Sequence, residues 1–314
     1  MNTIAVLTTG QMGSSFSACI KAANPSIRLV TDASKRSPRT QQLARDGSFE
    51  DLGSLEAVLS QADVVLSVVV PDKAVELAQE VAQQAKEMGD RGERIKTRFF
   101  ADLNAIAPTT VQSVAALFTE SPLRVVDGGI IGGPASSTSA PLIALSGEGA
   151  RELDDFLRPL FLGRTKVAGS EVGQASALKL AYASTTKGFL GLVVNATLLA
   201  DEYNVLQHLE EEFAASQPHT LKVLKNLIPR NTAKAFRWVG EMEEVSKAYG
   251  DAQLPFAATV FEGLAGTQQF IADNDVLGKE PIEEALKQIQ EGKRTAEDVL
   301  RMLKEGKLKG AGRA

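Results

Sequence analysis

A lysine in a nearly apolar stretch is the first residue whose surroundings indicate chemistry. Lys179 lies between Leu178 and Leu180, near the start of the run 174–200, which is rich in Ala and Leu and contains no proline. Burying an ammonium group is costly unless the group is paired or functional. Desolvation lowers the pKa of a lysine, which would allow Lys179 to give or take a proton near neutral pH. From periodicity alone, a lysine that snorkels at a helix edge is the simpler interpretation.

Two further polar residues follow in the same predicted helix. Tyr182 lies three residues after Lys179 and therefore on the same helical face. Its hydroxyl could hold a substrate oxygen or assist a proton transfer, and a tyrosine packed in the core is an equally good interpretation. Lys187 lies eight residues after Lys179, and we expect it to be an exposed ion.

A glycine-containing turn follows the first apolar run of the chain. It reads Thr8-Thr9-Gly10-Gln11-Met12-Gly13, a degenerate G-x-G-x-x-G in which Thr8 replaces the first glycine. Gly10 would let the backbone approach a pyrophosphate, which would rest on a helix N-terminus, and Gly13 would let the helix pack closely on the strand. An ordinary tight turn would look similar, but its place as the first strand-to-helix turn favours a dinucleotide site. We expect residues Thr9, Gly10, Gln11, Met12 and Gly13 to bind the dinucleotide.

The segment after the second predicted strand carries charges of both signs. It contains Asp32, Lys35, Arg36, Ser37 and Arg39. An acidic residue here hydrogen-bonds the ribose 2′-hydroxyl of NAD, whereas basic residues accept the 2′-phosphate of NADP. Two nearby cations outweigh one acid that lies further back, so we expect Lys35, Arg36 and Ser37 to bind NADP in preference to NAD. A basic loop in solvent would have the same composition.

Two later turns are also expected to contact the cofactor. Val70 and Pro71 stand at the end of a predicted strand, and we expect both to bind the dinucleotide. Asn104 follows another strand and could contact the ribose or the carboxamide. A helix cap or a turn before the next helix is the alternative interpretation of Asn104.

Strands and helices alternate through the first half of the chain. This alternation predicts right-handed βαβ units and a mostly parallel sheet covered on both faces, which is a Rossmann-type α/β domain. Strands are predicted at 4–8, 27–31, 63–70, 98–102, 124–127 and 142–146, and helices at 13–24, 38–47, 72–88 and from 108 onward.

Only helical periodicity follows residue 170. The run 174–200 predicts a helix about 40 Å long, which we expect to leave the first domain and to continue through the second. The sequence therefore predicts a dinucleotide-binding domain at 1–169 and an all-helical domain for substrate binding and dimerisation at 170–314, which begins with this long interdomain helix. Further helices are predicted at 205–215, 218–228, 231–249, 255–271 and 281–304.

Four short motifs give the chain a family resemblance. In their order and spacing it resembles the 6-phosphogluconate dehydrogenase-like superfamily, especially the β-hydroxyacid dehydrogenases and their 3-hydroxyisobutyrate dehydrogenase-like members. The motifs are Thr9–Gly13 for the cofactor fingerprint G-x-G-x-M-G, Asp102–Pro108 for the segment that reaches the nicotinamide, Asp127–Gly133 for the substrate segment D-A-P-V-S-G-G, and Gly173–Lys179 for the catalytic motif G-x-G-x-x-x-K. The resemblance implies that Lys179 is the general acid and base, assisted by Tyr182. It also implies that Ile131, Gly132 and Gly133 bind substrate together with Lys179 and Tyr182, the two glycines through backbone N–H groups.

The C-terminal half resembles a subgroup whose helical domain is uncharacterised. Arg237–Glu244, which reads RWVGEMEE, is similar to a signature of that subgroup. Trp238 is therefore a candidate substrate contact, although a packing stripe along a helix is the simpler interpretation of this segment.

Several positions depart from the usual pattern of the family. Thr8 replaces a glycine of the fingerprint, Ile131 replaces the serine of the substrate segment, and Ala175 replaces the second glycine of the lysine motif. Ala183 stands four residues after Lys179, where the family usually has an asparagine that orients the substrate. The substitution at Ala183 puts the usual 3-hydroxy-acid substrate in question.

Three functions compete on these residues. The leading interpretation is an NADP-dependent oxidoreductase that transfers a hydride between NADPH and a small carbonyl or hydroxy-acid substrate. An imine reductase shares this architecture but usually lacks the lysine, so Lys179 argues against it while Ala183 keeps it open. A cofactor-binding scaffold without catalysis is the third, and the joint presence of Gly10, Gly13, Asn104 and Lys179 argues against it.

Composition excludes several other classes. The net charge is −5, so nucleic acid is not expected as a partner. The single cysteine, Cys19, allows no internal disulfide and favours a cytoplasmic location, and two histidines without a Cys/His cluster predict no metal site. The longest apolar stretch is 13 residues, 188–200, against about 20 for a membrane span, so no membrane association is expected. The partners we expect are a small-molecule substrate and a second copy of the chain in a homodimer.

Overall fold

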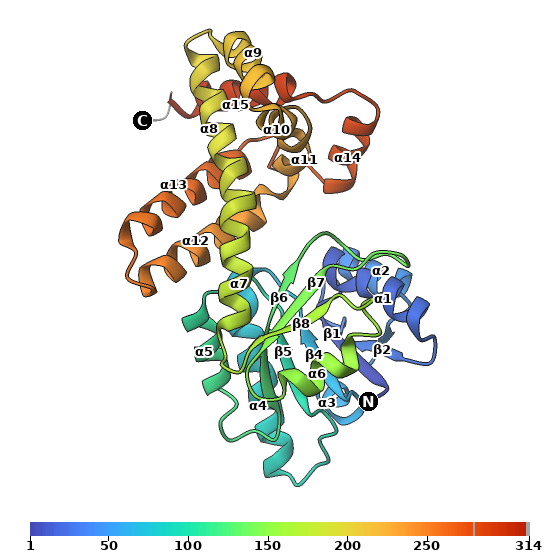
Figure 1. The fold of residues 1–314 in the computed structure, drawn as a ribbon. Coiled ribbons are helices and arrows are strands. Elements are labelled where there is room, and N and C mark those ends of the chain that lie inside the picture. The colour runs from blue at the N-terminus through green and yellow to red at the C-terminus, as the bar shows by residue number, and fades with distance from the viewer. Residues whose placement is uncertain (279, 312–314) are drawn as a thin grey trace. The chain divides into compact units, whose positions relative to one another are not determined.

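The computed structural model describes residues 1–278 and 280–311 and divides into two units, Met1–Tyr182 and Ala183–Ala314 (Figure 1). The units divide inside the helical stretch that begins at residue 174, whereas the sequence placed the division at 169–170. The difference arises because the first helix of that stretch, α7 (Gln174–Ala183), packs on the sheet of the first unit. The assignment of substrate binding and dimerisation to the second unit stays a prediction.

One eight-stranded sheet forms the centre of the first unit. Its strand order is β3-β2-β1-β4-β5-β6-β7-β8, and every neighbouring pair is parallel except β6 and β7. The predicted mostly parallel sheet is therefore confirmed. The strands are β1 (Thr3–Leu7), β2 (Arg28–Thr31), β3 (Glu50–Asp51), β4 (Val64–Ser67), β5 (Phe99–Asp102), β6 (Arg124–Ile131), β7 (Leu142–Ser146) and β8 (Thr165–Gly169).

Helices cover both faces of this sheet because successive strand residues point to opposite sides. Ile4 and Val6 of β1 join a core with α1, α2 and α6, while Ala5 and Leu7 join a second core with α3, α4 and α5. Figure 1 shows these helices on the two sides of the strands. The helices are α1 (Gln11–Ala23), α2 (Pro38–Asp46), α3 (Leu55–Gln61), α4 (Ala74–Asp90), α5 (Pro108–Ala116) and α6 (Ala150–Leu157), and a 3₁₀ turn, η1 (Pro71–Lys73), precedes α4.

The sequence missed four short elements and mistook the lengths of two strands. It did not predict β3, α3, α6 or β8, which are two to eight residues long and give little periodicity. The strand predicted at 63–70 spans only Val64–Ser67. The strand predicted at 124–127 continues to Ile131, because its second half pairs with β7 in antiparallel register. Residues 127–131 of the segment implied to bind substrate therefore lie in a strand.

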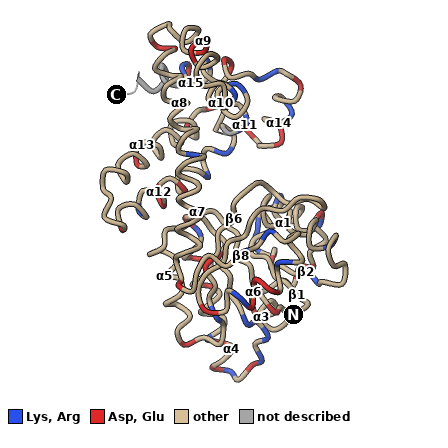
Figure 2. The backbone as a smooth tube through the Cα atoms, in the orientation of Figure 1, with Lys and Arg blue, Asp and Glu red and all other residues tan. Residues whose placement is uncertain are grey.

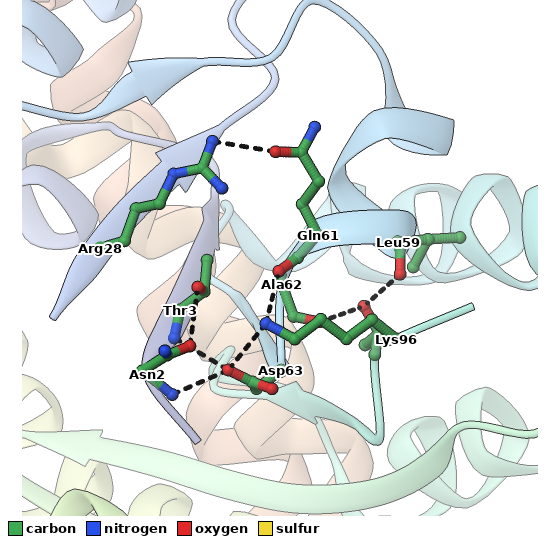
Figure 3. Close-up of polar contacts among 9 residues, drawn as sticks. Asn2, Thr3, Arg28, Leu59, Gln61, Ala62, Asp63 and Lys96 are labelled. Atoms are coloured by element: carbon green, nitrogen blue, oxygen red, sulfur yellow. Dashed lines mark hydrogen bonds and ion pairs between the residues drawn. The ribbon is translucent and has the colours of Figure 1, made fainter. Parts of the chain in front are cut away.

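A buried carboxylate joins strands at the edge of the sheet opposite to the glycine turn (Figure 3). Asp63 accepts hydrogen bonds from the backbone N–H groups of Asn2 and Thr3, at 2.8 and 2.9 Å, and from the ammonium of Lys96. Burial favours a raised pKa for Asp63, but these hydrogen bonds outweigh it and hold the pKa below its usual value. The contacts tie the start of β1 to the start of β4.

The described residues of the second unit form helices and turns, with no strand among them. A π-helical turn, η2 (Ser184–Gly188), continues α7 into α8, so the long helical stretch predicted at 174–200 is present with one local irregularity. Such turns are frequent at functional sites. The other elements are α8 (Phe189–Glu202), α9 (Leu206–Ser216), α10 (Pro218–Lys222), η3 (Val223–Leu227), α11 (Ile228–Asn231), η4 (Thr232–Lys234), α12 (Ala235–Asp251), α13 (Pro255–Ala272), α14 (Ile282–Gln290) and α15 (Ala296–Ala311).

Apolar side chains from α8, α9, η3 and α15 form the core of the second unit, and α12 and α13 pair as a helical hairpin. The rings of Tyr249 and Phe261 stack across that hairpin with centroids 5.2 Å apart. The single helix predicted at 281–304 is wrong. It is two helices, because the chain turns at Gly292, whose φ of +67° favours glycine. Figure 2 shows that Lys and Arg positions alternate with Asp and Glu positions in each unit.

Candidate active site

The glycine turn lies where the strand order changes direction. β1 has β2 on one side and β4 on the other, and parallel α/β sheets bind ligands outside the carboxyl ends of strands at such a point. β1 ends at Leu7 and α1 begins at Gln11, so the turn stands directly at this edge.

Glycine is present at Gly10 and at Gly13 for different structural reasons. A Cβ at Gly13 would lie 2.3 Å from the carbonyl oxygen of Thr8, so only glycine allows α1 to pack this closely on β1. A Cβ at Gly10 would have no neighbour within 4 Å, and Gly10 caps α1 without a side-chain hydrogen bond. Thr8 tolerates the loss of the family's first glycine because its φ is not positive, and its N–H donates to Val68 at 3.1 Å. An open turn with uncapped N–H groups fits a pyrophosphate.

The other predicted residues of this turn are less exposed to a ligand. Thr9 is buried, and its hydroxyl lies 3.4 Å from the carbonyl oxygen of Thr40. Gln11 and Met12 are partly buried in the first turn of α1. Their contacts with a dinucleotide stay predictions.

The basic segment follows β2 and therefore lies at the same edge as the glycine turn. Lys35 is exposed and Arg36 is partly buried, while Ser37 caps α2 by accepting a hydrogen bond from the N–H of Thr40. Asp32 accepts hydrogen bonds from both the N–H and the hydroxyl of Ser34, at 3.1 and 2.6 Å. The one acidic side chain of the segment is thus engaged in a local turn.

Asn104 is held inside the sheet edge by the neighbouring strand. Its side-chain oxygen accepts from the N–H of Val69 at 2.6 Å, and its side-chain nitrogen donates to the hydroxyl of Ser67 at 2.9 Å. The residue is 2% exposed. These bonds fix the segment that leads to Val70 and Pro71, which are partly buried at the start of η1.

A row of buried polar side chains crosses four neighbouring strands, at the last residue of β4, β5 and β7 and in the middle of β6. Ser67, Asp102, Asp127 and Ser146 are neighbours in the registers of β4, β5, β6 and β7, and all are fully buried. Asp102 accepts one hydrogen bond, from the N–H of Asn104, and its second oxygen has no hydrogen-bond partner among the described residues. Burial raises the pKa of Asp102 to about 7, and the adjacent Asp127 adds to this rise.

Asp127 caps the N-terminus of α7 from a different strand. Its carboxylate accepts hydrogen bonds from the N–H groups of Gly173, Ala175 and Ser176 at 2.9 to 3.1 Å, and from the hydroxyls of Ser146 and Ser176. Gly173 has a φ of +110°, which favours glycine. Ala175 lies within α7, where the backbone conformation does not require glycine. These contacts account for the departure from the family pattern at Ala175.

Lys179 packs against Gly129 of β6, while the neighbouring Gly128 faces the other side of the sheet. A Cβ at Gly129 would lie 2.6 Å from the Cβ of Lys179, and one at Gly128 would lie 2.4 Å from the side chain of Leu103. Both glycines are therefore required for close packing. Lys179 is partly buried, and Tyr182, one turn further along α7, is 49% exposed.

The predicted substrate segment ends beside this helix. Ile131 is the last residue of β6 and is partly buried, while Gly132 and Gly133 are exposed. Gly132 has a φ of +131°, a backbone conformation that favours glycine. The structure thus gathers the glycine turn, the basic segment, Lys179 and this segment in the first unit.

Trp238 belongs to the second unit, where it lies on α12. The ammonium of Lys187 stands 5.2 Å from the centroid of its ring and forms an ion pair with Glu241, which is buried. The expectation that Lys187 is an exposed ion is wrong, because the residue is paired and shielded by the indole. The role of Trp238 in substrate binding stays a prediction.

Sequence reasoning missed the residues that hold the site together. Asp127 was located only as the start of a substrate motif, and Asp102 only as the start of a cofactor motif. The signal that could have identified Asp127 is an aspartate followed by glycines inside an apolar strand, because a buried acid needs hydrogen-bond donors and a glycine on the same strand, here Gly129, admits a helix that offers them.

The part of the chain that the structure describes contains neither a membrane-spanning helix nor a cluster of metal ligands. No helix there is both long and apolar enough to cross a membrane. No group of three or more His, Cys, Asp or Glu side chains is arranged to hold a metal ion in the same residues.

Comparison with known families gives two matches. Residues 3–168 match the family described as the NAD binding domain of 6-phosphogluconate dehydrogenase. Residues 200–271 match a domain of unknown function, DUF1932. A curated 28.5 kDa uncharacterized protein of Methanothermus fervidus is 22% identical over 202 residues, which are 64% of this chain and 72% of that protein.

Solved structures share the fold over most of the chain. A conserved hypothetical protein of Sinorhizobium meliloti 1021 is 21% identical with a TM-score of 0.61, covering 96% of this chain and 97% of its own. The 3-hydroxyisobutyrate dehydrogenase of Mycobacterium tuberculosis is 18% identical with a TM-score of 0.64, covering 92% and 99%. An imine reductase of Myxococcus stipitatus, solved with NADP⁺, is 17% identical with a TM-score of 0.54, covering 96% and 99%. At these identities the likeness shows a shared fold.

The buried Asp102 predicts a specific pH dependence of stability. Because its pKa is about 7 when folded and near 4 when unfolded, the folded chain holds an extra proton between these values, and stability falls as pH rises from 4 to 7. Asp102→Asn keeps a neutral side chain and should remove this slope. We expect the free energy of unfolding at pH 8 to rise by up to about 4 kcal/mol relative to the native protein.

Denaturant unfolding between pH 4 and 8 measures this effect. Asp155→Asn, at an exposed position on α6, is the matched control and should leave the slope unchanged. Parallel pH profiles for Asp102→Asn and the native protein would contradict the prediction.

Proposed function

Because the chain belongs to the family defined by the NAD binding domain of 6-phosphogluconate dehydrogenase, we propose that it is an NADP-dependent oxidoreductase of the β-hydroxyacid dehydrogenase type. It transfers a hydride between NADPH and a small carbonyl or hydroxy-acid substrate. The observation that carries this proposal is the position of Lys179, on a helix capped by Asp127 at the edge of the sheet that also bears the glycine turn.

The dinucleotide binds at the carboxyl ends of β1, β2 and β4. Its pyrophosphate rests on the N-terminus of α1, which the open space at Gly10 and the missing side-chain cap support. When bound, the dinucleotide supplies the hydride. Lys35, Arg36 and Ser37 receive the 2′-phosphate, and Val70 and Pro71 border the nicotinamide half. Asn104 acts by holding the segment before Val70 in place.

Lys179 moves the proton that accompanies hydride transfer. During reduction its ammonium donates a proton to the carbonyl oxygen, and during oxidation its amine accepts one from the hydroxyl. Tyr182 orients the substrate oxygen from one turn further along the same helix. Ile131 bounds the substrate, and the N–H groups of Gly132 and Gly133 receive its carboxylate.

Removing the amine tests this role. Lys179→Ala should lower turnover by roughly 10²–10⁴-fold, because the proton moves in the transition state. The dissociation constant for NADPH should change little, since Lys179 lies on α7 and the dinucleotide binds at the turn before α1. NADPH oxidation measured against aldehydes, keto acids and cyclic imines gives both the turnover and the substrate class.

Tyr182→Phe is the comparison, and a smaller loss assigns an orienting role to the tyrosine. A Lys179→Ala protein with near-normal turnover of cyclic imines would favour the imine reductase, an alternative that the buried Ala183 supports because it offers no polar group where the family has asparagine. Tight NADPH binding without NADPH oxidation in the presence of any of these substrates would favour the cofactor-binding scaffold.

The preference for NADP rests on the charges beside β2. Lys35 and Arg36 provide cations for a phosphate, while Asp32 is occupied by two hydrogen bonds from Ser34 and is less available to a ribose hydroxyl. A guanidinium pairs with phosphate through parallel hydrogen bonds that a hydroxyl cannot replace.

Arg36→Ala should therefore raise the dissociation constant of NADPH by about tenfold and that of NADH by less than twofold. Titration of nicotinamide fluorescence measures both constants. Arg45→Ala is the control, because Arg45 lies at the far end of α2 and bonds to Gln42. Equal weakening of both dinucleotides by Arg36→Ala would exclude a 2′-phosphate site here.

We also propose that the protein is a homodimer that buries α8. Large apolar and aromatic side chains on α8 are exposed, which is typical of an interface. Leu192 and Leu199 lie along the helix and are 50% and 63% exposed, and Tyr203 at its C-terminal end is 71% exposed. Sedimentation of the native protein at micromolar concentration should give twice the chain mass of 33.4 kDa, and Leu199→Glu should shift it toward the monomer. A native protein that sediments only as a monomer would contradict the proposal.

A further inference from the structure

Residues 132–141, which continue the substrate segment after β6, make one hydrogen bond to another element among the described residues of the first unit. Between β6 and β7 the chain runs through residues 132–141, which are mostly exposed. Two further hydrogen bonds are internal to this segment, from the N–H of Ser136 to the carbonyl oxygen of Ser139 and from the N–H of Thr138 to the hydroxyl of Ser136. Within residues 1–278 and 280–311, the bond from the N–H of Ala135 to the hydroxyl of Ser15 is the only one that joins this segment to another element.

Ser15 lies on the helix that follows the glycine turn, and its hydroxyl is used twice. It accepts the N–H of Ala135 at 2.9 Å and donates to the carbonyl oxygen of Met12 at 2.6 Å. Met12 belongs to the first turn of α1, where the pyrophosphate is proposed to rest. One side chain thus joins the dinucleotide helix to a segment 120 residues away along the chain.

Two glycines form the base of the segment. Gly132 adopts a φ of +131° and Gly133 has open space around its Cβ position, so neither restrains the backbone through a side chain. Ala135 and Ala140 pack at the margin of the buried cluster that Met12 also borders, and they are small. Apolar packing of these alanines is not directional, so the hydrogen bond from Ala135 to Ser15 is what fixes the position of the segment relative to α1.

We propose that Ser15 is a positioning residue that holds residues 132–141 against α1, so that dinucleotide binding at the start of α1 orders this segment. This inference rests on the proposed function for the identity of the two ligands. A dinucleotide on the first turn of α1 restrains Met12 and Ser15, and the fixed hydroxyl then restrains Ala135. Gly132 and Gly133, three and two residues before Ala135, are thereby held where a substrate carboxylate meets them.

Ser15→Ala tests the tether, and the chain provides a matched control. Ser17 lies two residues further along α1 and donates to the carbonyl oxygen of Ser14, but it has no bond to the segment. Hydrogen exchange of residues 131–141 is measured with and without NADPH for the native protein, Ser15→Ala, Ser17→Ala and Ser15→Thr. The Michaelis constants and turnover are measured for the same proteins.

We expect NADPH to slow exchange of the segment in the native protein and in Ser17→Ala, but not in Ser15→Ala. The Michaelis constant for the carbonyl substrate should rise about three- to tenfold in Ser15→Ala, which is the usual worth of one hydrogen bond, while turnover and NADPH affinity stay within twofold. Ser15→Thr keeps the hydroxyl and should restore both readouts.

Exchange of the segment that is the same in Ser15→Ala and the native protein, with NADPH bound, would overturn the proposal. The proposal would also be overturned if NADPH did not slow the exchange of this segment in the native protein. The exchange arm needs no turnover, so Ser15-dependent protection by NADPH in a protein that reduces no substrate would support the tether while contradicting the proposed activity.

Discussion

The first unit depends on a buried carboxylate that satisfies the end of a helix. Asp127 accepts three backbone N–H groups from the start of α7 and two hydroxyls. A helix begins with N–H groups that lack partners within the helix, and leaving them unpaired in the core would be costly. Because the cap comes from β6 and not from the residue before the helix, it fixes the helix against the sheet. The position of Lys179 follows from this one interaction.

Close packing of α7 on β6 fixes the position of Lys179 at this edge of the sheet. Gly128 and Gly129 follow Asp127 in β6, and any side chain at Gly129 would collide with the Cβ of Lys179. The same row of the sheet also carries Asp102, whose second oxygen lacks a partner in the described structure and whose pKa burial raises to about 7. The protein therefore bears an electrostatic cost beside the site while the Asp127 contacts keep the helix in place.

The carboxyl edge of the sheet is held together by polar bonds between turns that are distant in sequence. Asn104 joins the turn after β5 to the turn after β4, and Ser15 joins α1 to the segment after β6. The Cβ positions of Gly10 and Gly133, at this edge, have open space around them, so a ligand can approach the backbone there. The opposite edge has its own fastening in Asp63, which binds the start of β1, so the two edges are restrained independently.

The sequence by itself determined the class of the fold and the type of each long element. The alternation of short apolar runs with helical patterns predicted the α/β unit, helical periodicity alone predicted the helical unit, and the order of four motifs indicated the family, because these signals are local. It did not determine the short elements β3, α3, α6 and β8, the break at Gly292, or the extension of β6 to Ile131, since these depend on pairing partners or on a backbone angle. Only the tertiary structure decided that Asp127 caps α7, that Gly129 admits Lys179, and that Lys187 is paired with Glu241. Each of these contacts joins residues far apart in the chain, and a buried charge acquires its meaning only from the donors that the fold brings to it.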